Sequence, residues 1–249
     1  IDYLVSLVEQ RVLFSIYTKE HPPDFEKIVP EWANSIYKLG ELNPSASQEE
    51  IKRSSSVGLE IEQSIWTNKF EVNFCHLNYE EQSKKVRFVL ARVSEELEKE
   101  CHGDVDFQFL MNASKYEIDH IIPQSTVSDS DVDDDLKEFI HSVGNLVLIQ
   151  KKKNSSMKDK TPKEKIAYYK DGLVAHMMLC SKEDLSIAVT NKKVAVGKVI
   201  DETGFNLSEW TTESIRKRTY FCMNYFAKTF KDLDPPLFAY ESVEKIAVL

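Results

Sequence analysis

Residues 116–123 read YEIDHIIP, and residues 145–150 read NLVLIQ. Both stretches are rich in β-branched and apolar residues; a proline ends the first, and a glycine precedes the second. This pattern is typical of two short strands. The sequence TPKE at 161–164 then forms a capping box with proline at the first helical position, which predicts a helix over Pro162–Tyr169. Strand, loop, strand and helix together predict a small ββα unit.

Helical patterns lie on both sides of this unit. Apolar residues recur with a period near 3.6 over Ile1–Lys19, Tyr79–Cys101 and Glu213–Phe230. Further helices are expected over Asp24–Leu39 and, between the two strands, over Leu136–Ser142. We therefore predict an α+β protein that is mainly α-helical, with the ββα unit embedded between helical regions. The predicted division is an N-terminal helical region at 1–105, the ββα unit at 106–175 and a C-terminal helical region at 176–249.

Composition limits the class of protein. The 249 residues are 42% hydrophobic and 29% charged, which suits a chain with a packed core and excludes a largely disordered one. The sequence contains neither an apolar run long enough for a membrane span nor a signal-peptide pattern, so a soluble, cytoplasmic protein is expected. Four scattered cysteines without a C-x-x-C pair favour reduced thiols. The first residue is not Met, which is compatible with a piece of a longer polypeptide.

The charged pair Asp119–His120 stands inside the first, otherwise apolar strand. Adjacent strand residues point to opposite faces, so one of the two faces inward or the strand ends there. An acid and an imidazole at a strand end indicate the edge of a functional site. A local ion pair with no function explains the dipeptide alone about equally well.

The segments YEIDHIIPQS, HSVGNLVLIQ and KKKNSSMKDK together resemble the HNH, or His-Me finger, nucleases. The first is similar to the Asp-His strand of the HNH domain in RNA-guided CRISPR effector nucleases. The surrounding chain resembles the C-terminal HNH domain of GmrSD-type, modification-dependent restriction enzymes. The resemblance is specific over Tyr116–Tyr169, weak over about 40 residues on each side, and absent over the first 75. It implies that the ββα unit is a ββα-metal finger.

Site roles follow from the resemblance, position by position. His120 matches the general base that takes a proton from the attacking water, for which a neutral imidazole is suited. Asp119 and Asn154 match the ligands of one metal ion, and their oxygen atoms suit Mg²⁺ or Mn²⁺. Asn145 matches the middle residue of the motif, which supports the loop and orients the base. Because Asn154 stands where the family often has His, a zinc preference is disfavoured.

Each of these residues also has a simpler interpretation. Asn145 after a glycine is common turn chemistry, and Asn154 is a good helix N-cap. His141 could touch substrate, although an ordinary histidine at a helix C-terminus is favoured. The chain also lacks the four zinc-binding cysteines of many HNH proteins, so packing of helices must hold the finger.

Lysines follow the second strand in a chain whose net charge is −9. An acidic total disfavours a protein that only coats nucleic acid, but an enzyme needs only a local basic patch. Beside a phosphodiesterase site such lysines would contact phosphates, whereas a lysine-rich face alone is usually just solvated. Four arginines, at 87, 92, 216 and 218, are further candidates. The acidic loop 128–135 is expected to be solvated, because it lacks an EF-hand pattern. The lysines expected to bind nucleic acid are Lys151, Lys152, Lys153, Lys158 and Lys160.

The resemblance implies a metal-dependent endonuclease that cleaves DNA, in bacterial restriction or defence against phage. Such enzymes often carry a nucleotide-hydrolysing module, and neither its DGQQR signature nor a P-loop occurs here, so a removed segment or a separate partner would supply sensing. One finger cuts one strand, so a double-strand break needs a homo-oligomer or two events. Three alternatives remain open: an RNA-cleaving nuclease or toxin, a catalytically inactive domain that binds nucleic acid or a partner, and a helical interaction protein.

Overall fold

The computed structural model describes residues 2–21, 61–128, 134–185 and 190–240, together with scattered positions between 30 and 50. Of the expected helix Asp24–Leu39, residues 30, 31, 33–35, 37 and 38 are described and are helical. Its other residues and most of the acidic loop lie outside the described part of the chain. The described residues divide into two compact units, one within Ile1–Phe74 and Ala227–Leu237 and the other within Cys75–Phe226 and Phe238–Val248. The predicted three-part division stays a prediction. Among the described residues, no helix is long and apolar enough to cross a membrane.

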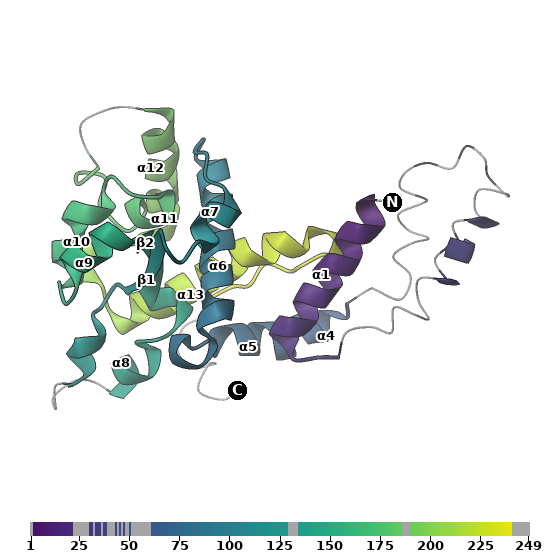
Figure 1. Cartoon of the computed structure of the whole chain (residues 1–249), viewed down its shortest axis with the longest axis horizontal. Helices are drawn as coiled ribbons and strands as arrows, with labels where there is room; N and C mark the ends of the chain where they lie inside the picture. Colours follow the sequence, from purple (N-terminus) through teal and green to yellow (C-terminus); the bar gives the residue numbers. More distant parts are fainter. Residues whose placement is uncertain are drawn as a thin grey trace. The chain divides into compact units, whose positions relative to one another are not determined.

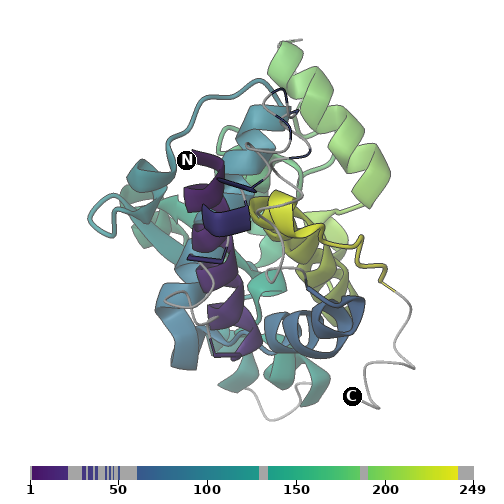
Figure 2. The ribbon, with the colours of Figure 1, turned by 90° about the vertical axis from the view of Figure 1, so that its right-hand side faces the viewer.

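The first unit, whose helices are drawn as ribbons in Figure 2, is built around an aromatic cluster. Phe14 of α1 packs against Trp66 and Phe70 of the π-helical segment η1, with ring centroids 4.5 and 5.6 Å away, and against Phe230 of η5 at 5.7 Å. All four rings are fully buried, so their packing forms the core of this unit. The elements of this unit are α1 (Asp2–Thr18), α4 (Gln63–Ile65), η1 (Trp66–Glu71), α5 (Val72–Cys75, which reaches the boundary) and η5 (Lys228–Leu233).

The second unit contains one two-stranded antiparallel sheet among helices, and α6 supplies its longest packing surface (Figure 1). The α6 stripe from Val86 to Leu97 is buried, as its spacing predicts. The elements of this unit are α6 (Tyr79–Glu100), α7 (Phe107–Met111), β1 (Tyr116–His120), η2 (Gln124–Ser128), α8 (Asp134–Phe139), η3 (Val143–Asn145), β2 (Leu146–Gln150), α9 (Lys151–Met157), α10 (Pro162–Tyr169), α11 (Val174–Met177), α12 (Asn191–Thr203), η4 (Leu207–Glu209) and α13 (Thr212–Ala227).

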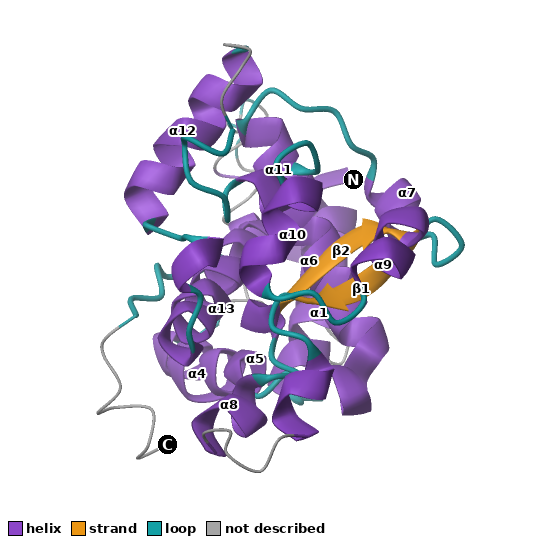
Figure 3. Ribbon diagram, turned by 90° about the vertical axis from the view of Figure 1, so that its left-hand side faces the viewer, coloured by secondary structure: helices purple, strands orange, loops and turns teal. Residues whose placement is uncertain are grey.

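The sheet pairs Tyr116 with Gln150 at one end and His120 with Leu146 at the other. All four residues from Leu146 to Ile149 are buried, because α6 packs against β2 while α9 lies across both strands; Figure 3 shows the strands beneath α9. This arrangement explains why β2 is a continuous apolar run rather than an alternating one. A mainly helical fold with a small two-stranded antiparallel sheet is thus confirmed.

Several boundaries differ from the sequence-based expectations. β1 ends at His120 and not at Pro123, because the Asn145 side chain bonds both the N–H and the carbonyl of Ile122 and draws the chain out of the ladder. The N-cap alternative for Asn154 is wrong: α9 begins at Lys151 immediately after β2, and Asn154 lies inside the helix. The short helix between the strands, α8, begins and ends earlier than predicted. The capped helix α10 has the predicted bounds and the predicted capping box.

Two close approaches join α13 to the start of β2. A side chain at Gly144 would place its Cβ 1.9 Å from the Ile215 carbonyl oxygen, so only glycine fits there. The buried Arg218 guanidinium donates to the carbonyls of Gly144 and Leu146 at 2.9 and 2.8 Å. Arg218 is therefore a structural residue, which corrects its candidacy as a phosphate contact.

A buried histidine connects β2 to α11. His176 is 2% exposed; its Nε2 bonds the Leu148 carbonyl at 2.7 Å, and its Nδ1 accepts from the Leu173 N–H at 3.0 Å. This pair of bonds requires the neutral imidazole with its proton on Nε2. Burial is the main cause that lowers the pKa of His176 from 6.5 to about 3.

We predict that His176 makes folding sensitive to mild acid. Below pH 6.5 the unfolded chain binds a proton at His176, whereas the folded chain binds one only near pH 3. The free energy of unfolding therefore falls as the pH falls. Between pH 7.5 and 5 this residue alone should cost about 2 kcal/mol of unfolding free energy. Urea unfolding at both values should show a smaller pH dependence for His176→Gln than for the unchanged chain. Equal pH dependence in the two proteins would contradict the assignment.

Candidate active site

Asp119 and His120 leave β1 on opposite faces, as adjacent strand residues do. Asp119 is 6% exposed and faces α10, whereas His120 is half-buried and faces the segment before β2. The strand therefore presents two different polar clusters at its end.

Asp119 belongs to a buried ion pair. The Lys165 ammonium donates to both carboxylate oxygens at 3.0 and 2.9 Å and also to the His120 carbonyl, and the Tyr169 hydroxyl donates to Asp119 at 2.7 Å. Burial raises the pKa of Asp119 and lowers that of Lys165, and in each case the opposite charge of the partner counteracts the shift. Because Lys165 is 0% exposed, it is not part of the solvated lysine face.

His120 belongs to a chain of hydrogen-bonded groups. Its Nε2 lies 3.0 Å from His141 Nδ1, and His141 Nε2 lies 3.2 Å from the Glu80 carboxylate at the start of α6. Tyr79 places its ring against both imidazoles, with centroids 5.4 and 6.4 Å away. His141 is thus a partner of His120 two residues beyond the end of α8, which corrects its interpretation as an ordinary helix C-terminal histidine.

The tautomers of the two histidines follow from this chain. A carboxylate only accepts, so His141 Nε2 carries a proton and His141 Nδ1 accepts from His120 Nε2–H. His120 Nδ1 is then the unprotonated nitrogen, and within the described residues it has no hydrogen-bond partner. Burial first, and then the neighbouring His141 and Lys165, lower the pKa of His120 from 6.5 to about 4, so the ring is neutral near pH 7.

The Asn145 side chain connects the segment after His120 to the segment before His141. Its side chain is fully buried; it accepts from the Ile122 N–H at 2.9 Å and donates to the carbonyls of Ile122 and Ile140 at 3.1 and 2.9 Å. Ile122 follows His120, and Ile140 precedes His141. The Asn145 amide therefore sets the distance between the two histidine-bearing segments.

Two oxygen-bearing side chains, Glu117 and Asn154, meet where α9 contacts β1. Asn154 Nδ2 donates to Glu117 at 3.0 Å, and no described residue donates to its amide oxygen. Glu117 shares a strand face with Asp119, and its pKa is lowered chiefly by the bond from Asn154. Two carboxylates and an amide oxygen fit a hard divalent ion in their chemistry. Among the described residues, no hydrogen bond joins Asn154 to Asp119. The positive charge that contacts the Asp119 carboxylate is the Lys165 ammonium. Within the described ranges, no three His, Cys, Asp or Glu side chains form a cluster that could hold an ion.

The predicted nucleic-acid-binding lysines lie on and after α9. Lys151, Lys152 and Lys158 are exposed, and Lys153 and Lys160 are half-buried. Lys151 lies 3.3 Å from the Glu117 carboxylate. The three remaining arginine candidates also have protein partners: Arg87 bonds the Tyr116 carbonyl, Arg92 packs on Phe107 and pairs with Glu95, and Arg216 pairs with Asp135.

Sequence reasoning missed the roles of Glu80, Lys165 and Tyr169. Lys165 and Tyr169 are spaced i, i+4 on the predicted helix and so share one face, which was the available signal. Nothing in the sequence connects Glu80 to its partner His141, which follows 61 positions later.

We predict that Asp119 is required for folding as well as for any chemistry. Asp119→Asn leaves the Lys165 ammonium buried without its counter-charge and should lower the free energy of unfolding by about 3–5 kcal/mol. Adding Lys165→Met removes the stranded charge, so the double variant should recover most of that loss in urea unfolding. An unchanged unfolding free energy in Asp119→Asn would show that the ion pair is not formed.

The comparisons with known proteins give one family match. A family model for the C-terminal domain of the GmrSD restriction endonucleases matches residues 66–221. The match covers more than half of the chain and includes every site residue named above. No curated protein and no solved structure matches the chain. The chain therefore belongs to the GmrSD restriction endonuclease family, as a representative of its C-terminal domain.

Proposed function

We propose that this chain is a metal-dependent DNA endonuclease that hydrolyses phosphodiester bonds through a ββα-metal finger. The finger is formed by β1, β2 and α9, the helix that carries Asn154, whereas the helix predicted for the ββα unit, Pro162–Tyr169, is the following helix α10. Family membership supports a nuclease of the restriction type. The observation that carries the proposal is the state of His120. One ring nitrogen is fixed by His141, and the other has no partner among the described residues and is unprotonated.

His120 acts as the general base in this proposal. Its Nδ1 lone pair takes a proton from the water that attacks phosphorus, and the ring becomes an imidazolium. The His120 Nε2–H keeps its bond to His141, and the Glu80 carboxylate on the far side of His141 offsets the new positive charge. His141 and Glu80 are therefore positioning residues, comparable in role to the third member of a catalytic triad.

Asp119 and Asn154 would hold one Mg²⁺ or Mn²⁺. When bound, the ion would stabilise negative charge on the phosphate and on the departing 3′ oxygen. Glu117 supports this role because it holds the Asn154 amide group and leaves the amide oxygen open. Lys165 holds the Asp119 side chain and the His120 carbonyl together at the strand end.

Asn145 orients His120 by fixing the backbone that follows it. The exposed lysines of α9 contact phosphates and add affinity that does not depend on base sequence. We propose a role in restriction or defence against phage, in which a separate partner or module selects the target. A homo-oligomer would allow both strands to be cut.

His120→Ala should abolish plasmid nicking in Mg²⁺ or Mn²⁺, because the substitution removes the unprotonated Nδ1 that takes the proton from the attacking water. The assay compares supercoiled plasmid, single-stranded DNA and tRNA, with EDTA as the metal-free control. Cleavage of plasmid by the unchanged chain, and none by His120→Ala, supports the DNA endonuclease. Preference for tRNA would favour an RNA-cleaving enzyme, and no cleavage of any substrate would favour the inactive binding domain.

Loss of the His141 contact should slow cleavage without preventing folding. His141→Phe keeps the ring against Tyr79 but removes both hydrogen bonds, and should lower kcat about tenfold, the effect of one lost hydrogen bond in the transition state. His141→Asn retains an acceptor near His120 Nε2 and should recover part of the rate. The KM for plasmid should stay constant in both variants. Equal rates in both variants and the unchanged chain would refute the positioning role.

A further inference from the structure

The end of the sheet opposite His120 opens onto a basic surface whose aromatic residues have no role in the proposed function. A cavity of about 330 Å³ is lined there by residues of the loop before β1 and by the junction of β2 with α9. We name it the lysine–aromatic pocket. Its lining consists of Phe109, Ser114, Lys115, Tyr116, Gln150, Lys151 and Lys152.

Phe109 is the feature that needs an explanation. α7 buries Leu110 completely, whereas Phe109 remains 49% exposed. Its ring meets Tyr116 edge to face at 5.4 Å, and its N–H is capped by the Asp106 carboxylate at 3.1 Å. The ring is thus fixed in orientation yet uncovered. One exposed phenylalanine is ordinary on a protein surface, so only the residues around it can indicate whether it belongs to a binding site.

Those surroundings are basic, although the chain as a whole carries a net charge of −9. The lining contains three lysines and no acidic residue. Lys115 and Lys152 are exposed and form no ion pair within the described residues, and Lys151 shares its charge with Glu117. An open aromatic ring among unneutralised lysines is the combination that binds unpaired nucleotides, because bases stack on the ring while ammonium groups contact phosphates.

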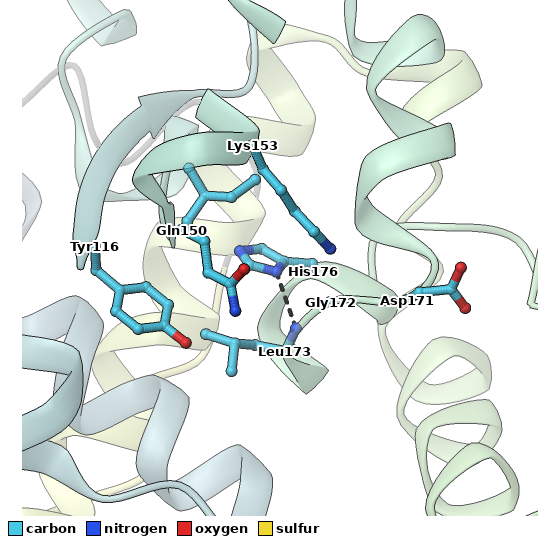
Figure 4. A pocket seen from close by; sticks show the side chains of 8 residues that line it. Tyr116, Gln150, Lys153, Asp171, Gly172, Leu173 and His176 are labelled. Carbon is cyan, nitrogen blue, oxygen red and sulfur yellow. Dashed lines mark hydrogen bonds between the residues drawn. The ribbon is translucent and has the colours of Figure 1, made fainter. Parts of the chain in front are cut away.

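The polar surface continues from this pocket around Tyr116 and Gln150. Both residues also line a second cavity of about 160 Å³, where the Tyr116 hydroxyl, the Gln150 amide and the Lys153 ammonium point inward and the Asp171 carboxylate points away (Figure 4). The two cavities thus share Tyr116 and Gln150 in their linings, and Lys153 of α9 adds one lysine beside the second.

The spacing connects this pocket to the reaction centre. Tyr116 and His120 are four residues apart on β1, which is about 13 Å at the rise of a strand. One strand of a duplex advances by about 3.4 Å per nucleotide, so the same strand can reach both ends of the sheet within roughly four nucleotides.

We infer that the lysine–aromatic pocket binds one unpaired base of the DNA strand, stacked on Phe109, with the neighbouring phosphates held by Lys115 and Lys152. This inference rests on the proposed function, since it assigns the strand cut at His120 a second contact. It implies that the substrate is locally unpaired a few nucleotides from the cut.

Fluorescence anisotropy in EDTA tests this binding without any cleavage. The probes are a labelled oligothymidylate, an abasic oligomer of equal length and a fully paired duplex. Phe109→Ala should weaken binding of oligothymidylate about 5- to 100-fold, as the loss of one stacked base does. Binding of the abasic oligomer and the duplex should not change. Phe109→Trp should restore affinity, and Lys152→Gln should weaken all three probes and reduce the salt dependence of binding.

Val194→Ala serves as the matched control, because Val194 is also 49% exposed and lies on α12. Thermal unfolding verifies that each variant is folded. The inference is overturned if Phe109→Ala weakens the abasic oligomer as much as oligothymidylate, or if it weakens neither. Failure of the proposed function is a separate result: oligothymidylate would bind through Phe109, but plasmid would not be nicked.

Discussion

The fully buried amide of Asn145 is the constraint on which the site depends. A buried amide must satisfy its donors and acceptor, and here all three bonds go to backbone groups of the two segments that carry His120 and His141. These bonds end β1 at His120 and fix the backbone before His141. A side chain without both donor and acceptor would leave Ile122 unsatisfied and would release the strand end. The 3.0 Å contact between the two imidazoles is therefore a consequence of Asn145.

Because adjacent side chains of β1 point to opposite faces, the strand separates a buried ion pair from a neutral histidine. On one face, Asp119 is neutralised by Lys165 in a buried pair that holds α10 against the strand. On the other face, His120 is kept neutral by burial and oriented by a chain that ends in a partly exposed carboxylate. The His120 carbonyl joins the two faces, because Lys165 donates to it. Movement of α10 would thus change the position of the His120 imidazole through the backbone, without any direct contact with the ring.

The sequence predicted the elements whose signals are local. The capping box of α10, the apolar stripe of α6 and both strands depend on residues within one element, and each was found close to its true bounds. The end of β1 was misplaced because Asn145, a residue from another strand, decides it. Lys165 was assigned no role from the sequence, since nothing in its neighbourhood shows that a carboxylate 46 positions earlier meets it. His141 and Glu80 form their chain through tertiary contacts alone, so a single sequence carries no pattern for them. The resemblance to the family named the residues of the motif but not their supporting partners.

The acidic total charge and the proposed substrate are reconciled by where the lysines lie. Repulsion between the chain and DNA acts over about a Debye length, roughly 8 Å at physiological salt, so distant carboxylates are screened. Close to the sheet the balance is reversed, because Glu117 is held by Asn154 and Lys151, and Asp119 is matched by Lys165. The lysines of the lysine–aromatic pocket without such partners then dominate the local field. A strand that offers only phosphates is held by these few lysines alone, so it would be released faster than one that also offers an unpaired base to Phe109.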